Sequence, residues 1–171
     1  MTPLRTLARD EGAGLRFAGY AALFDVADGA RDVIRPGAFR RSLGMRSAGG
    51  TGPLPLFWQH RPDQRIGWIE HASEDLRGLR VIASIDNPAG RAAAVLQSGA
   101  VDGLSFGFRA RSARTGTGGR ELIELDLFEI SLVTHPLQPN ARVHFVDPPA
   151  AQASAAVASP IRPPSDTTNI L

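Results

Sequence analysis

Residues 101–133 read VDGLSFGFRARSARTGTGGRELIELDLFEISLV and contain the most informative pattern for the fold. Aliphatic and aromatic residues flank the glycine-rich segment TGTGG, residues 115–119, on both sides. This pattern predicts two long strands, over 101–112 and 120–133, that pair as a hairpin. Alternate residues of a strand point to opposite faces, so we expect one face of the first strand to enter the core and the other to leave it. The two sets are Leu104, Phe106 and Phe108, facing the core, and Gly103, Ser105 and Gly107, facing away from it.

Shorter strands are predicted before this hairpin. Residues 15–24 are rich in aromatic and aliphatic side chains without helical spacing, 54–60 form a strand that ends at His60, and 66–71 and 79–85 form a second hairpin. One short helix is expected in AFRRSL, residues 38–43. A second helix is expected from Asn87 to Ser98, with Pro88 in its first position and Gly99 as its stop. The sequence therefore predicts a β-rich α+β fold.

The 171 residues fit one domain with a single core. With 43% hydrophobic and 21% charged residues, the composition is that of a folded protein. We expect a flexible N-terminal segment over 1–14 and a folded domain over 15–147. Residues 148–171 are dominated by Ala, Pro and Ser and predict a disordered tail.

Composition also excludes several kinds of chemistry. The chain has no cysteine and no lysine, which rules out disulfides, zinc thiolates, a Cys nucleophile and a Ser–Lys dyad. The net charge is only +2 and the arginines are scattered among the acids, so we expect no nucleic-acid partner. No signal peptide or membrane-length apolar run is visible, which predicts a cytoplasmic protein without a membrane partner. No cofactor or metal is expected, because the histidines lack the spacing of a metal pair.

Ser105 is the candidate nucleophile. It lies between two glycines, which would let an extended peptide backbone approach its hydroxyl. The alternative is a strand packed tightly against a neighbour, and the motif is not the nucleophile elbow of hydrolases, which requires a turn from strand to helix. A serine also needs a base within hydrogen-bond reach. His60 suits that task, since it is expected at a strand end beside a loop, whereas His71, His135 and His144 stand in less suitable contexts.

Glu129 is the candidate third residue. On regular alternation it shares a strand face with Leu125, Leu127 and Val133, and a carboxylate among aliphatic side chains requires a partner. That partner is either an arginine in a structural ion pair or a histidine that the carboxylate orients.

Six sequence blocks together resemble the prohead proteases of tailed bacteriophages, which are related to the herpesvirus assemblins. The blocks occur in the family's order and approximate spacing and cover about Gly19 to Val143. They are GYAALFD (19–25), IRPGAFRRSL (34–43), FWQH (57–60), RIG (65–67), GLSFGF (103–108) and LFEISLVTHP (127–136). Two departures stand out: Arg61-Pro62 separates His60 from Asp63, and Leu137-Gln138 replaces a common aromatic residue.

The resemblance implies an assemblin-like, mostly antiparallel β-barrel core with short flanking helices. It implies a capsid-maturation serine endopeptidase with Ser105 as nucleophile, His60 as base and Glu129 as the third catalytic residue. The implied substrates are the scaffolding segment of the major capsid protein and the protease itself, cleaved inside an assembling procapsid in the bacterial cytoplasm. A homo-oligomer is compatible with this assignment, and so is a phage, prophage or gene transfer agent origin. The rival functions are a non-enzymatic capsid-assembly module and an esterase or amidase.

Overall fold

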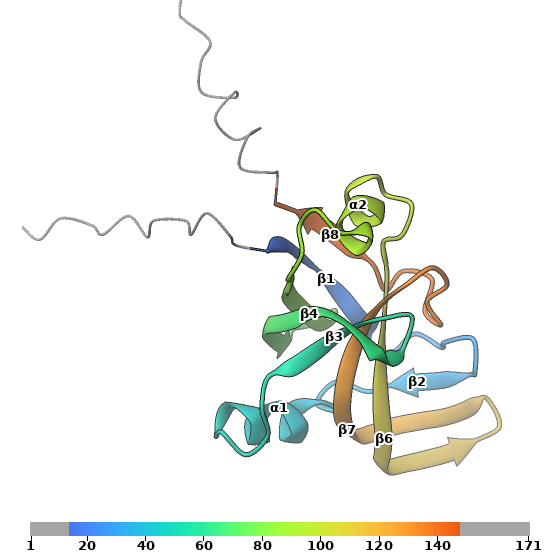
Figure 1. Ribbon diagram of the computed structural model, residues 1–171. Coiled ribbons are helices and arrows are strands. Elements are labelled where there is room, and N and C mark those ends of the chain that lie inside the picture. The colour runs from blue at the N-terminus through green and yellow to red at the C-terminus, as the bar shows by residue number, and fades with distance from the viewer. Residues whose placement is uncertain (1–13, 148–171) are drawn as a thin grey trace, which may run out of the picture.

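The computed structural model describes residues 14–147 (Figure 1). The predicted flexible N-terminal segment, 1–14, and the predicted tail, 148–171, lie outside the described residues, apart from Gly14. No helix in the described part of the chain is long and apolar enough to cross a membrane.

The described chain consists mainly of strands, with two short helices. Its elements in chain order are β1 (Leu15–Leu23), β2 (Asp32–Ile34), α1 (Arg40–Ser47), β3 (Leu54–Trp58), β4 (Arg61–Glu74), β5 (Gly78–Ile85), α2 (Arg91–Gln97), β6 (Gly103–Gly116), β7 (Gly119–Val133) and β8 (Val143–Val146). The prediction of a β-rich domain with short helices is confirmed, as are both predicted hairpins, β4–β5 and β6–β7. The strands β2 and β8 were not predicted.

The strands form one curled sheet in the order β2-β7-β3-β4-β5-β1-β8, and β6 pairs with β7 (Figure 1). Because β6 pairs along the whole of β7, the strands β2 and β3 share the other edge of β7, one near each end. Both run parallel to β7, whereas the other pairings are antiparallel. The sheet is therefore mixed rather than strictly antiparallel. Parallel pairing joins segments far apart in the sequence, and hence local patterns do not reveal it.

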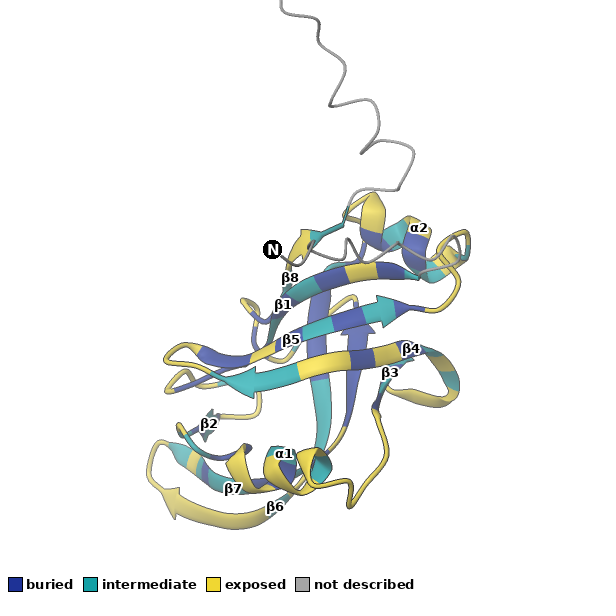
Figure 2. Cartoon of the chain, turned by 90° about the vertical axis from the view of Figure 1, so that its left-hand side faces the viewer, coloured by how far each residue is buried: buried dark blue, intermediate teal, exposed yellow. Residues whose placement is uncertain are grey.

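Hydrogen bonds link the two ends of the curled sheet. The amide of Leu104, at the start of β6, donates to the carbonyl oxygen of Ala141 at 2.8 Å, and the amide of Val143 donates to the carbonyl oxygen of Asp102 at 2.8 Å. The chain then continues into β8, which pairs with β1. Buried and exposed residues alternate along β1, β5 and β4 (Figure 2), so their buried faces line a common core inside the curl.

The helix α1 covers a gap at the edge of β7 between β2 and β3. The amide of Leu125 donates to the carbonyl oxygen of Ala38 at 2.9 Å, and the amide of Leu127 donates to the hydroxyl of Ser42 at 3.0 Å. The guanidinium of Arg46 donates to the carbonyl oxygen of Leu127 at 2.8 Å. These contacts satisfy buried backbone groups that no neighbouring strand reaches, and they fix the middle of β7.

The second helix is shorter than predicted at its N-terminus. The side-chain oxygen of Asn87 accepts a hydrogen bond from the amide of Ala89 at 3.1 Å, and the backbone carbonyl oxygen of Asn87 accepts one from the amide of Gly90 at 3.0 Å. These bonds form a turn in place of the first helical turn, so Pro88 does not start the helix, and α2 begins after the extended residue Gly90. The predicted stop is confirmed, because Gly99 has a φ of +72°.

Candidate active site

Ser105 lies on β6, opposite Ser131 of β7. It is buried, with 8% of its surface exposed. The predicted alternation of β6 is present here: Leu104 belongs to the core, and the ring of Phe106 packs edge-on against that of Phe39 at 5.3 Å. The opposite face of β6 therefore carries the hydroxyl of Ser105 away from the core and toward the residues of β7.

His60 lies in a turn and not at the end of a strand as predicted. The strand β3 ends at Trp58, which pairs with Arg61, and the two residues between them have positive φ angles, 51° for Gln59 and 58° for His60. A two-residue hairpin requires such angles to match the twist of its strands, and glycine or asparagine usually supplies them. Residues of other types cost about 1 kcal/mol each in this conformation.

Hydrogen bonds to β7 hold this strained turn. The amide of Gln59 donates to the carbonyl oxygen of Leu132 at 3.0 Å, and the amide of His60 donates to the hydroxyl of Ser131 at 3.2 Å. The turn is thereby fixed over the edge of β7. From there the imidazole of His60 reaches across β7 to Ser105 on the next strand.

Glu129 owes its direction to a β-bulge in β7. In the pairing of β6 with β7, Gly107 lies opposite Glu129, but the next residue, Phe108, lies opposite Leu127. Phe128 therefore has no partner and is half exposed. An extra residue in one strand reverses the alternation of side chains beyond it.

Because of this bulge, the prediction that Glu129 shares a strand face with Leu125 and Leu127 is wrong. Leu125 and Leu127 point into the core and are no more than 1% exposed, whereas Glu129 points to the other face together with Ser131. Regular alternation would have placed Glu129 among the leucines. The bulge lets the strand fill the core and present a carboxylate on the same face as Ser105.

The structure brings the three predicted residues together in one chain of hydrogen bonds. The Nε2 atom of His60 lies 2.9 Å from the Oγ atom of Ser105, and its Nδ1 atom lies 2.7 Å from an oxygen of Glu129. A carboxylate only accepts hydrogen bonds, so Nδ1 carries a proton toward it, and Nε2 is then free to accept from the serine hydroxyl. The other oxygen of Glu129 accepts a hydrogen bond of 2.6 Å from the hydroxyl of Ser131.

The surroundings of His60 favour its charged form. The hydrogen bond to Glu129 raises the pKa of His60 above its ordinary value, and the charge of the carboxylate adds to this, while partial burial opposes it. The Glu129 side chain is only 10% exposed and the His60 side chain is 44% exposed. A buried anion thus faces a histidine that solvent can reach.

The protein itself occupies the space beside the two glycines that flank Ser105. A Cβ atom on Gly107 would lie 2.7 Å from an oxygen of Glu129, and one on Gly103 would lie 2.5 Å from the carbonyl oxygen of Val133. The protein's own atoms fill both spaces, which agrees with the alternative of tight packing. The absence of a side chain at Gly107 leaves the space that the carboxylate of Glu129 occupies.

The remaining histidines take no part in this network. His71, His135 and His144 are exposed, and the ring of His144 packs edge-on against Tyr20 at 5.8 Å. Among residues 14–147, no group of three or more histidine, aspartate and glutamate side chains is arranged to hold a metal ion.

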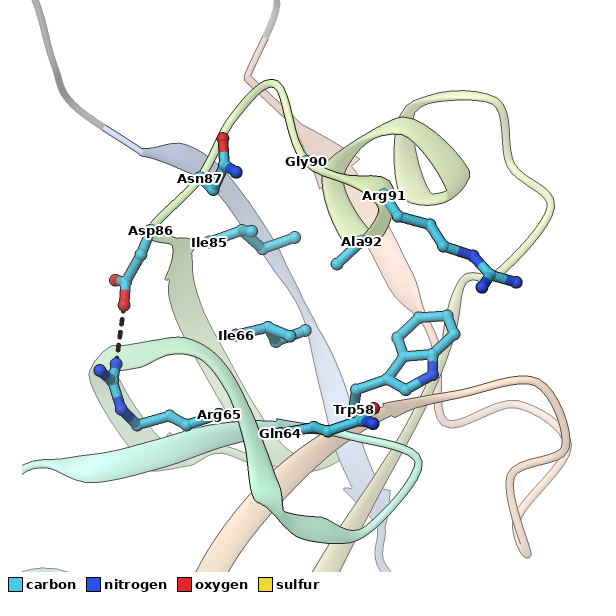
Figure 3. Close-up of a pocket in the computed structure, with 10 residues that line it drawn as sticks. All are labelled: Trp58, Gln64, Arg65, Ile66, Ile85, Asp86, Asn87, Gly90, Arg91 and Ala92. Carbon is cyan, nitrogen blue, oxygen red and sulfur yellow. Dashed lines mark hydrogen bonds and ion pairs between the residues drawn. The ribbon is translucent and has the colours of Figure 1, made fainter.

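Two hollows lie near these elements. A small one of about 20 Å³ adjoins Ser105 and is lined by apolar groups of Ala21, Ile34, Phe106, Leu137 and Ala141 among others. A larger cavity of about 360 Å³ lies between the β3–β4 hairpin and the start of α2, with Trp58 beside Arg91 and with Ile66 and Ile85 in its floor (Figure 3). The larger cavity includes none of the three predicted residues, whereas Ser105 lines the small hollow.

Ser131 also belongs to this network and was not predicted from the sequence. Its hydroxyl contacts both Glu129 and the backbone of His60, and it lies opposite Ser105. A signal was present, because Ser131 is a small polar residue inside the apolar run from 125 to 133.

Comparisons with known proteins point to one family. Residues 2–155 match the family described as caudovirus prohead serine protease. The chain is 34% identical over 96 residues to the prohead protease of Enterobacteria phage HK97, covering 54% of this chain and 41% of that protein. It is 28% identical over 130 residues to the capsid polyprotein of Pseudomonas phage PAJU2, covering 70% of this chain and 18% of that protein. The chain thus spans less than half the length of either relative.

Solved structures share the fold at low sequence identity. The bacteriophage T4 capsid assembly protease superimposes with a TM-score of 0.57 at 17% identity, covering 72% of this chain and 84% of that one. The KSHV protease in complex with a hexapeptide phosphonate inhibitor superimposes with a TM-score of 0.54 at 16% identity, covering 83% of this chain and 68% of that one.

Proposed function

Because the chain belongs to the caudovirus prohead serine protease family, we propose that it is a serine endopeptidase of capsid maturation with Ser105 as its nucleophile. One observation carries this proposal: a continuous path of hydrogen bonds from Ser105 through His60 to Glu129. A nucleophile, a base within reach of it and a group that orients the base are the parts that acyl transfer requires.

The first half of the reaction acylates the enzyme. The Oγ atom of Ser105 attacks the carbonyl carbon of the scissile peptide bond while its proton moves to Nε2 of His60. The C–N bond then breaks, and His60 returns this proton to the leaving amine, which leaves an ester on Ser105. In the second half His60 takes a proton from a water molecule as its oxygen attacks the ester carbon. The bond from that carbon to Oγ then breaks, the fragment leaves with a new carboxyl group, and His60 returns the proton to Ser105.

Glu129 serves both halves without reacting. Its hydrogen bond to Nδ1 keeps the proton of neutral His60 on that nitrogen, which leaves Nε2 as the acceptor. Its charge also stabilises the imidazolium that forms in each half, in agreement with the raised pKa of His60. The carboxylate need not be protonated at any step.

The negative charge on the substrate oxygen needs hydrogen-bond donors, and we expect them among the backbone amides beside Ser105. The amide of Leu104 points away from β7, toward Ala141. Amides two residues apart in a strand point to the same edge, so the amide of Phe106 faces that edge too. Phe106 also borders the small hollow next to Ser105, which makes its amide the best candidate donor.

The proposed substrates are the scaffolding segment of the major capsid protein and the protease itself, cleaved inside an assembling procapsid. The names of the two phage relatives, a prohead protease and a capsid polyprotein, support this setting. The proposed fold class is likewise the assemblin-like barrel, supported by the link between the ends of the curled sheet.

Labelling with a fluorophosphonate tests the nucleophile. The reagent loses fluoride when an activated serine attacks its phosphorus, so the wild type should be labelled and Ser105→Ala should not. The non-enzymatic assembly module predicts no labelling of either protein. A second assay distinguishes an endopeptidase from an esterase. Unlabelled wild-type protein is incubated with capsid protein that carries its scaffolding segment and, separately, with simple esters. Hydrolysis of the esters alone would refute the proposed substrate class.

A further inference from the structure

Ser131 is a fully buried polar residue in the middle of β7. Its strand neighbours Ile130 and Leu132 enter the core, while its own side chain points to the face of Ser105 and Glu129. Burying a hydroxyl costs free energy unless it is hydrogen-bonded. Ser131 satisfies both its donor and its acceptor capacity, and both partners belong to the proposed catalytic apparatus.

The hydroxyl of Ser131 donates a hydrogen bond to Oε2 of Glu129 at 2.6 Å and accepts one from the amide of His60 at 3.2 Å. The first bond leaves the other carboxylate oxygen to His60 Nδ1, and fixes the rotation of the carboxylate. The second bond holds a turn in which two residues have positive φ angles. One oxygen atom thus sets the position of a side chain on β7 and of a backbone on the β3–β4 hairpin.

We propose that Ser131 is a positioning residue that holds Glu129 and the His60 turn in register with Ser105. This inference rests on the proposed function, because the register matters only if the three residues react as a unit. Without the hydroxyl, the carboxylate loses one of its two hydrogen-bond partners among the described side chains and can rotate away from Nδ1. The amide of His60 then faces the vacated space without its acceptor.

A buried serine could also serve stability alone, and a matched control separates the two roles. Ser42 is also buried, and its hydroxyl accepts a hydrogen bond from the amide of Leu127 on β7, but it has no hydrogen bond to Glu129 or His60. Ser131→Ala and Ser42→Ala each remove one buried hydroxyl that is hydrogen-bonded to a residue of β7, the first from β7 itself and the second from α1. Ser131→Thr keeps the hydroxyl and serves as the conservative variant.

The experiment measures three quantities for each variant: the melting temperature, the pKa of the His60 ring by NMR titration, and the pH dependence of fluorophosphonate labelling. We expect Ser131→Ala to label about ten- to a hundredfold more slowly than the wild type. We also expect its His60 pKa to fall toward the ordinary value. Ser42→Ala should lower the melting temperature but keep the wild-type His60 pKa and labelling rate. Ser131→Thr should recover most of the rate and the pKa.

A Ser131→Ala variant with the wild-type His60 pKa and labelling rate would overturn the inference, whatever its melting temperature. The NMR titration does not depend on activity. If the wild type itself is not labelled, the proposed function fails, yet a lowered His60 pKa in Ser131→Ala alone would still establish that Ser131 positions the pair. The two failures are therefore distinguishable.

Discussion

Replacing Gly107 with alanine should disable the site while leaving the fold intact. The added Cβ atom would lie 2.7 Å from an oxygen of Glu129 and 3.0 Å from its Cγ atom. Ordinary contact begins at 3.4 Å, so that oxygen, now 2.7 Å away, must retreat by about 0.7 Å. The same oxygen bonds to His60 Nδ1 at 2.7 Å, and this short bond cannot survive a shift of that size unchanged.

The expected loss is kinetic. A displacement of catalytic groups by about 1 Å costs on the order of a hundredfold in rate. We therefore expect fluorophosphonate labelling of Gly107→Ala to slow by about that factor. The φ angle of Gly107 is not in the left-handed region, so alanine adds no backbone strain, and the melting temperature should change little.

Gly116→Ala is the matched control. It lies on the same strand, and its added Cβ atom would meet nothing within 4 Å. Its labelling rate should equal that of the wild type. The reasoning fails if Gly107→Ala is labelled at the wild-type rate, because the carboxylate would then be free to move without consequence for His60. An equal loss in both variants would also refute it, since the effect would come from the strand and not from Glu129.

Two further predictions concern Glu129 and the tail. Glu129→Gln should lower kcat by about 10³- to 10⁴-fold, because an amide can present its N–H₂ group to Nδ1 and impose the wrong tautomer. Its pH profile should rise at lower pH than that of the wild type, whose base becomes active only above the raised pKa of His60. The raised pKa also means that the pair stabilises the fold fully below the unfolded pKa and less as pH rises through the folded one. The melting temperature of Glu129→Gln should therefore fall further below that of the wild type in mild acid than at alkaline pH. For the tail, 148–171, intact masses of the wild type and Ser105→Ala are compared: self-processing predicts a shortened wild type beside a full-length variant, and equal full-length masses refute it.

The sequence predicted the antiparallel part of the fold well. The β6–β7 hairpin follows from two apolar runs around TGTGG, and the helix α1 and the β4–β5 hairpin follow from equally local patterns. The parallel pairings of β2 and β3 with β7 leave no such trace, since each joins segments far apart in the chain. The strand β2 has only three residues, too few for a period to be visible.

The sequence identified the three candidate residues but not the geometry that joins them. Ser105, His60 and Glu129 came from residue chemistry and family resemblance together, and the structure brings their side chains within hydrogen-bond distance. The turn at His60 could not be foreseen, because Gln-His is not a usual sequence for a hairpin with two positive φ angles. Ser131 was overlooked because its role depends on a cross-strand register that the sequence does not state.

These failures share a physical cause. A regular sheet would place Glu129 on the face of Leu127, in the core, and would keep His60 in the strand that precedes it. Three local departures bring the groups together: the bulge at Phe128 turns the carboxylate outward, the strained turn carries the imidazole across β7, and Gly107 leaves space for the carboxylate. Each departure costs stability or packing where it occurs, and each is held by bonds to β7 or by the packing of β6 against it. Rules of regular alternation are therefore least reliable at the residues that form the site.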